Sequence, residues 1–142
     1  MEVKFTVPGR PIAKGRPRMT KTGHTYTPQQ TVEYENLVRL EYQRQCGGFQ
    51  FAKDIPLDVR IIAYYPIPKS VSHKKYAQMT DGIIRPMKKP DADNVCKSIL
   101  DSLNAIAYHD DAQVVDCQIR KFYSTSPRVA VTILPVNQDR SE

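Results

Sequence analysis

The chain has 142 residues, of which 40% are hydrophobic and 25% are charged. This length suits one domain with its own hydrophobic core, and the composition is that of a globular protein rather than a disordered one. No apolar run approaches the roughly 20 residues that a membrane-spanning helix needs. Residues 1–8 alternate polar with apolar, unlike a signal peptide. We therefore expect a cytoplasmic protein with no membrane partner.

The net charge is +6 at pH 7. A basic protein favours an anionic partner, most commonly nucleic acid, although a solvated basic surface without a partner would give the same total. The positions of the charged residues along the chain therefore say more about a nucleic-acid partner than the net charge does. Cys46, Cys96 and Cys117 are odd in number and widely spaced, with no C-x-x-C pair, so they are interpreted as ordinary thiols in a reducing compartment.

Alternating polar and apolar residues predict a half-buried strand from Glu2 to Val7. The next segment, about residues 9–26, contains many Lys and Arg side chains and no acid. Its prolines and glycines interrupt regular structure, so a basic, mobile loop is expected there. Such a long loop in a small domain is usually functional or disordered.

A helix is predicted to follow this loop. Thr27 can cap it, Pro28 suits the first helical position, and Gln30 completes a capping box. Gly47 and Gly48 mark its end. The apolar stripe of this helix is expected to comprise Val32, Leu37, Val38 and Leu40.

The remaining elements follow from periodicity and turn residues. They are a strand at Leu57 to Tyr65, a weak helix at Ser70 to Met79, a helix at about Asp93 to Ile106, and strands at about Gln113 to Tyr123 and Arg128 to Leu134. The order β-α-β-(α)-α-β-β predicts one α/β or α+β domain over residues 1–142, with helices packed on a face of a small mixed sheet. Residues from about 136 to 142 are expected to fray.

The densest chemical signal is the run from Lys89 through Pro90, Asp91, Ala92 and Asp93 to Asn94. Residues two apart in an extended segment point the same way, so Asp91 and Asp93 can aim at one point where the loop becomes a helix. Lys97 follows Asp93 by four residues, one turn further along the same face. Asp101 continues that polar side, and we assign it to the helix or to a supporting position.

Asp110 and Asp111 follow this helix through a tight turn. A strand that returns beside the helix would bring them back toward Asp91 and Asp93. Carboxylates that converge in this way repel one another unless a hard cation neutralises them. Oxygen ligands alone suit Mg²⁺ or Mn²⁺.

Each of these features also has an ordinary explanation. Asp93 can simply cap the helix, and Asp110 and Asp111 can be turn residues. Lys97 can be an exposed partner of a helix acid, and the basic loop can be solvated disorder. The combination favours function, because acids that cluster within a basic chain are what a metal-dependent phosphodiesterase needs.

These residues resemble a known family. Lys89 to Asn94, Lys97, the run from Leu100 to Asn104, and the run from Asp110 to Val114 look like the RusA family of Holliday-junction resolvases. That family is bacterial or phage-borne and is often carried on prophages. The similarity is dense over about 25 residues, and Pro8 to Arg18 is also similar to some members.

The resemblance implies a homodimeric endonuclease that resolves Holliday junctions by Mg²⁺-dependent, paired phosphodiester cleavage in DNA recombination and repair. It implies catalytic roles for Asp91, Asp93, Lys97 and Asp111, with metal bound by the three aspartates and Asp110 as a further candidate ligand. The basic residues expected to grip branched double-stranded DNA are Arg10, Lys14, Arg16, Arg18, Lys21, Lys88 and Lys89. One departure is Ala105, where members often have glycine after Asn104, so the turn before Tyr108 is expected to differ.

Three other functions compete with this hypothesis. A non-catalytic protein that binds branched DNA would use the same basic surface and would bind without cutting. A phosphoacceptor domain would carry its acid pair early, after a strand, whereas here the acids come late. A structural basic protein would leave the acid cluster unexplained.

Overall fold

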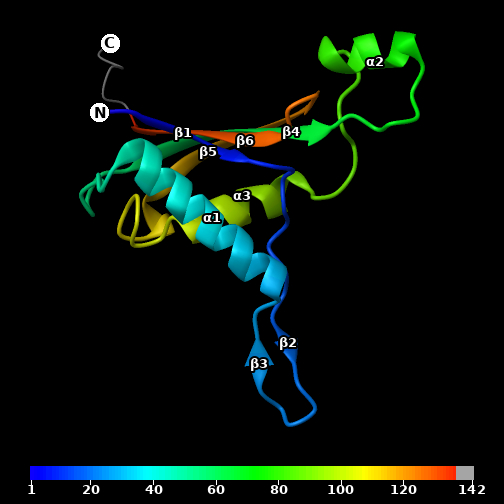
Figure 1. Cartoon of the computed structure of the whole chain (residues 1–142). Helices are drawn as coiled ribbons and strands as arrows, with labels where there is room; N and C mark the ends of the chain where they lie inside the picture. Colours follow the sequence, from blue (N-terminus) through cyan, green and yellow to red (C-terminus); the bar gives the residue numbers. More distant parts are fainter. Residues whose placement is uncertain (137–142) are drawn as a thin grey trace.

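The computed structural model describes residues 1–136 and shows a four-stranded mixed sheet with helices against one face (Figure 1). The strand order is β1-β6-β4-β5, formed by β1 (Val3–Pro8), β6 (Arg128–Pro135), β4 (Leu57–Pro66) and β5 (Val114–Ser124). β4 and β5 run parallel, whereas the other neighbours are antiparallel. The predicted α+β architecture is confirmed. The predicted frayed tail lies, apart from residue 136, outside the described residues.

Two helices lie along the sheet and a third stands at its end (Figure 1). α1 (Gln29–Cys46) contacts β1 and α3, and α3 (Ala92–Ser102) also contacts β5. α2 (His73–Thr80) follows β4, and Ser72 caps it by accepting a hydrogen bond from the backbone N–H of Lys75. In the described part of the chain, no helix combines the length and the apolar character needed to cross a membrane.

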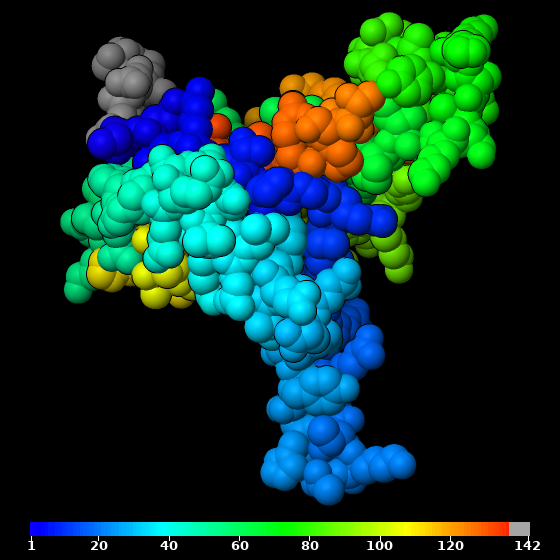
Figure 2. Space-filling view, viewed as in Figure 1, coloured from blue at the N-terminus to red at the C-terminus, as the bar shows by residue number. Residues whose placement is uncertain are grey.

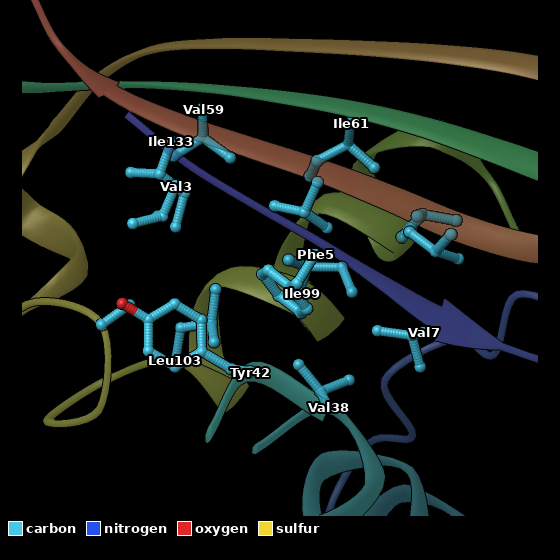
Figure 3. Packing of buried hydrophobic residues seen from close by; sticks show 14 of the residues in the cluster. Val3, Phe5, Val7, Val38, Tyr42, Val59, Ile61, Ile99, Leu103 and Ile133 are labelled. Atoms are coloured by element: carbon cyan, nitrogen blue, oxygen red, sulfur yellow. The ribbon is translucent and has the colours of Figure 1, made fainter. Parts of the chain in front are cut away.

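The core lies between the sheet and the helices α1 and α3, as Figure 3 shows. On β4 every second residue is buried, as the alternation predicts; these residues are Leu57, Val59, Ile61, Ala63 and Tyr65. Ile99 of α3 and Leu103, the C-cap residue of that helix, belong to the same core, and Phe5 packs edge-on against Tyr42 with ring centroids 5.3 Å apart. Full burial of each such side chain contributes about 1.5–3 kcal/mol.

The start of α1 differs from the prediction. Pro28 itself is the N-cap, in an extended conformation, and no side chain caps the helix, so the predicted capping box at Thr27 is wrong. The buried stripe is also shifted, because two tyrosines carry more apolar area than the leucines. Tyr34, Val38 and Tyr42 face the core. Val38 is buried and Leu37 packs against the core as predicted, whereas Leu40 is 58% exposed.

The basic segment contains more structure than the expected loop. β2 (Arg18–Met19) pairs with β3 (Thr25–Tyr26), and the backbone N–H of Thr20 donates to the His24 carbonyl at 2.7 Å. Figure 2 shows this hairpin projecting away from the body of the molecule. We call residues 16–26 the basic arm. The expectation of an irregular loop is therefore wrong for its central part.

The third helix is shorter than predicted, because it ends at Ser102 instead of near Ile106. Ala105 adopts φ +64°, a left-handed conformation that favours glycine. The chain therefore makes a glycine-type turn with alanine. This turn brings Tyr108 back to the helix, where its hydroxyl donates to the Leu100 carbonyl at 2.7 Å.

Replacing Ala105 with glycine should stabilise the protein. The left-handed backbone costs a residue with a Cβ roughly 1–2 kcal/mol, and the greater freedom of glycine in the unfolded chain offsets part of that gain. We expect Ala105→Gly to raise the free energy of unfolding by about 0.5–1 kcal/mol in urea titrations. Ala105→Val should lower it, since β-branching worsens the strain. Equal unfolding free energies for Ala105→Gly and Ala105→Val would show that the backbone at this turn carries no strain.

Candidate functional site

A surface hollow of about 500 Å³ runs along α3. Three of the charged side chains that line it, Asp93, Lys97 and Asp101, recur every four residues and so share one face of the helix. Asp111 lines the same hollow from the turn that precedes β5. The structure thus brings together four of the polar residues that the sequence singled out.

Asp91 lies at the beginning of α3 but not among the residues that line the hollow. It occupies the N-cap position with an extended backbone, yet its side chain makes no capping hydrogen bond. The ordinary explanation for Asp93, that it caps the helix, is therefore wrong, because Asp91 holds that position. The exposed Asp91 carboxylate is left available to other partners.

A network of side-chain amides positions Asp111. The Asn104 side-chain oxygen accepts a hydrogen bond from the Asp111 backbone N–H at 2.7 Å. Gln113 accepts from the backbone N–H groups of His109 and Asp110, and donates to the carbonyls before β4. The turn that presents Asp111 is therefore fixed from both sides.

Asp110 behaves differently from its neighbour. Its carboxylate accepts a hydrogen bond from the Ala112 backbone N–H at 3.0 Å and so caps the short 3-10 helix η1 (Asp111–Gln113). It lines a separate depression with Lys53 and Asp54, not the hollow along α3. This geometry gives Asp110 the turn role that the sequence offered as an alternative.

The electrostatics of the hollow concentrate on Asp111. Its pKa is raised above the ordinary value of 3.8, first because burial disfavours the charged carboxylate and then because the Asp101 carboxyl shares a hydrogen bond with it. The negative charge of Asp110 adds to this effect, whereas the hydrogen bond with Asn104 opposes it. The Asp101 carboxyl is therefore close enough to Asp111 to disfavour the ionised form of Asp111.

The acids divide into two groups along the helix. Asp91 and Asp93 lie at its beginning, whereas Asp101 is eight residues beyond Asp93, or about 12 Å along the axis at 1.5 Å per residue. Within residues 1–136, no three His, Cys, Asp or Glu side chains gather closely enough to hold one metal ion. Metal binding by Asp91, Asp93 and Asp111 together therefore stays a prediction.

Lys14 reaches the second group from the segment before the basic arm. Its ammonium lies 2.6 Å from the Asp101 carboxylate and 3.7 Å from that of Glu35. The hydrogen bond with Asp101 raises the pKa of Lys14 above its ordinary value of 10.5, against the effect of burial. Lys14 was predicted as a DNA contact, but here its charge is taken up by two acids.

Gly15 explains how this segment approaches α1 so closely. Its backbone N–H donates to the Thr31 hydroxyl at 2.8 Å. A Cβ at this position would lie 2.7 Å from that same oxygen and 3.0 Å from Pro28, which is too close. The glycine therefore lets the base of the basic arm dock beside the acids of the hollow.

The other predicted DNA contacts lie in two places. Arg16, Arg18 and Lys21 are exposed on the basic arm, and Arg10 is exposed just after β1. Lys88 and Lys89 are exposed before α3; the ammonium of Lys88 lies 5.6 Å from the ring centre of Tyr123. Both places offer exposed cations, and DNA contact by these residues stays a prediction.

Three features of the site escaped the sequence analysis. The pairing of Lys14 with Asp101 depends on residues 87 positions apart, so no local pattern could reveal it. The only sequence indication that Asn104 and Gln113 position the site is that they lie close to the aspartates in the chain. The contact between Cys96 and Cys117, which both line the hollow, had no signal at all.

Removing the Asp101 charge should lower the pKa of Asp111. In metal-free protein labelled with ¹³C at the aspartate carboxyls, NMR titration should show Asp111 of the parent protein titrating above its ordinary range. Asp101→Asn should move that titration downward, because the shared proton and the like charge are both lost. An unmoved Asp111 titration would contradict an effect of Asp101 on its pKa.

The same shift fixes the sign of the pH dependence of stability. Because the pKa of folded Asp111 is raised, its contribution to stability is fully present below the unfolded pKa and is lost as pH rises through the folded value. Asp101→Asn should therefore flatten the stability profile just above pH 4. Urea titrations at several pH values measure this.

Comparisons with known proteins agree with the motifs. Residues 8–134 match the family described as endodeoxyribonuclease RusA. The chain is also 40% identical over 140 residues to the uncharacterized protein YqaN of Bacillus subtilis strain 168, covering 95% of this chain and 97% of that protein. Because the family match spans nearly the whole described structure, with the acid hollow inside it, the chain belongs to the RusA endodeoxyribonuclease family.

Proposed function

We propose that the protein is a divalent-metal-dependent endonuclease that resolves four-way DNA junctions by paired cuts. The observation that carries this proposal is the gathering of Asp93, Lys97, Asp101 and Asp111 in one hollow, with Asp91 at the head of the same helix. Family membership supports the reaction class. The two cuts, the branched substrate and the metal are parts of the proposal.

The donor atoms of the site fit Mg²⁺ or Mn²⁺. Mg²⁺ commonly takes only one or two carboxylates and completes its shell with water and substrate phosphate. Asp91 with Asp93, or Asp101 with Asp111, offers such a pair, and we propose Asp91, Asp93 and Asp111 as the ligands that matter. A bound ion would supply polarisation of the scissile phosphate and activation of a water molecule.

The protein side chains contribute orientation and charge. Lys97 is exposed on the hollow midway between Asp93 and Asp101, where its ammonium can contact a phosphate oxygen and stabilise charge that develops in the transition state. Lys14 offsets the charge of Asp101, which limits repulsion between the carboxylates at that end. Asn104 holds Asp111 in place by accepting a hydrogen bond from its backbone N–H.

The basic surface supplies affinity rather than sequence selection. Lys88 and Lys89 directly precede α3, and the basic arm follows Lys14, which pairs with Asp101 in the hollow, so a DNA backbone attracted to these cations passes close to the acids. A four-way junction has two-fold symmetry, and a C₂ homodimer would present two sites in the matching symmetry. Light scattering that shows only one protein chain bound per junction would exclude that dimer.

The metal site is tested by incubating a labelled four-way junction with the protein, with and without Mg²⁺ or Mn²⁺. We expect paired, symmetric nicks that need the metal. Asp91→Asn and Asp111→Asn should each slow cleavage about 100-fold or more, because each removes a ligand. Asp116→Asn is the matched control, since Asp116 is an exposed acid on β5 that does not line the hollow.

The outcomes separate the competing functions. The control should stay within about twofold of the parent protein, as for most exposed substitutions. Junction binding that persists in every variant, with no cutting in either metal, would favour the non-catalytic DNA-binding alternative. Cutting that survives in Asp91→Asn but not in Asp101→Asn would assign the metal ion to Asp101 and Asp111 instead.

The basic arm is tested by the salt dependence of binding. Each phosphate contact that is lost should lower the slope of log affinity against log salt by roughly 0.9. We expect the double variant Arg18→Gln/Lys21→Gln to make this negative slope shallower by about 1–2. Lys74→Gln/Lys75→Gln on α2 removes the same charge from another part of the molecule and should leave the slope unchanged; equal effects from both pairs would rule out a specific role for the arm.

A further inference from the structure

Two of the three cysteines meet although 21 positions separate them in the chain. The Sγ atoms of Cys96 on α3 and Cys117 on β5 lie 2.9 Å apart. A disulfide bond is about 2.05 Å long, so the sulfurs are about 0.9 Å from bonding distance. Small rotations of two side chains can close such a gap, whereas most cysteine pairs would require the backbone to move.

The pair is open to small reagents from the hollow. Both thiols line it beside Asp93 and Lys97, and Cys117 is exposed whereas Cys96 is partly buried. Cys46 provides a contrast within the same chain. It is partly buried on α1, where its thiol donates to the Lys4 carbonyl at 3.5 Å, and it does not line the hollow.

We propose that Cys96 and Cys117 are an oxidation site, at which a peroxide converts the two thiols into a disulfide that ties α3 to β5 along the hollow. The pair would be reduced under ordinary reducing conditions and oxidised when peroxide rises, as in transient regulatory disulfides. Disulfide formation itself does not depend on the proposed function.

The chemistry balances with peroxide as the only oxidant. The Cys96 thiolate attacks one peroxide oxygen, the O–O bond breaks, and sulfenic acid and hydroxide form. The Cys117 sulfur then attacks the Cys96 sulfur, the S–O bond of the sulfenic acid breaks, and the departing hydroxide takes up the Cys117 proton and leaves as water, so that the S–S bond remains. A hydrogen bond with Cys117 lowers the pKa of Cys96, which suits Cys96 as the first nucleophile.

Oxidation has a consequence for the metal site that does rest on the proposed function. Cys96 lies on the helix that carries Asp93, Lys97 and Asp101, and Cys117 lies on the strand that follows Asp111. The disulfide would fix these two elements relative to each other, so the carboxylates would lose the freedom to adjust to the distances that a bound ion requires, which are met to within about 0.2 Å. The disulfide should therefore weaken binding of a divalent ion by about tenfold, as other changes around a metal site do.

The modification is tested on the full chain by mass spectrometry after treatment with a small excess of hydrogen peroxide. The intact mass should fall by about 2 Da as two hydrogens are lost, and dithiothreitol should restore it. Proteolytic peptides should show Cys96 linked to Cys117. Cys46→Ser should behave like the parent protein, whereas Cys96→Ser and Cys117→Ser should not form the link. Stable sulfinic acid on either thiol, or links through Cys46, would overturn the proposal.

The consequence is tested by Mn²⁺ titration followed by electron paramagnetic resonance, which needs no DNA. Oxidised protein should bind Mn²⁺ about tenfold more weakly than reduced protein, and oxidant should not change the affinity of Cys117→Ser. Equal affinities with the disulfide present would overturn the coupling to the site. Reduced protein that binds no Mn²⁺ would overturn the proposed function and that coupling, and would leave the oxidation site standing on its own mass data.

Discussion

The parallel pairing of β4 with β5 is the constraint on which the site depends. Two parallel strands cannot be joined by a tight turn, so the chain must cross back over the sheet between them. α3 makes most of that return, and its apolar residues Val95 and Ile99 bury against the sheet. The charged residues of α3 must instead stay in contact with solvent, so its polar stripe lies at the border between the helix and β5. Residues 117 and 119 of β5 then complete the hollow beside that stripe.

The return of the chain after α3 decides which acids meet. The helix stops at Ser102, and the left-handed Ala105 turns the backbone within a few residues. Asn104 and Gln113 then fix the turn through backbone hydrogen bonds, so that Asp111 faces Asp101 while Asp110 is used as a cap. A strained turn is retained here because it positions a carboxylate. The departure from glycine at this position therefore leaves the turn in place and raises its conformational cost.

Charge is separated in space as well as in sequence. The carboxylates line a hollow, and the exposed cations stand on the basic arm and before α3. Lys14 joins the two regions, because it lies just before the arm in the chain and pairs with Asp101. This arrangement lets a polyanion be attracted over a wide surface while the acids keep a compensating charge nearby. Close docking of the arm through Gly15 makes the link rigid at its base.

The sequence by itself determined the strands of the sheet, the existence of three helices and the identity of the acids. Alternation on β1 and β4 and the spacing of Val95, Ile99 and Leu103 are local patterns, so burial follows from them directly. The start of α1 and the hairpin in the basic arm are local features that the sequence patterns did not reveal. The tertiary structure alone decided which face of α1 meets the core, and the contacts of Lys14 with Asp101 and of Cys117 with Cys96. Each of these depends on residues that are distant in the chain or on competition between side chains for the core, which no local pattern encodes.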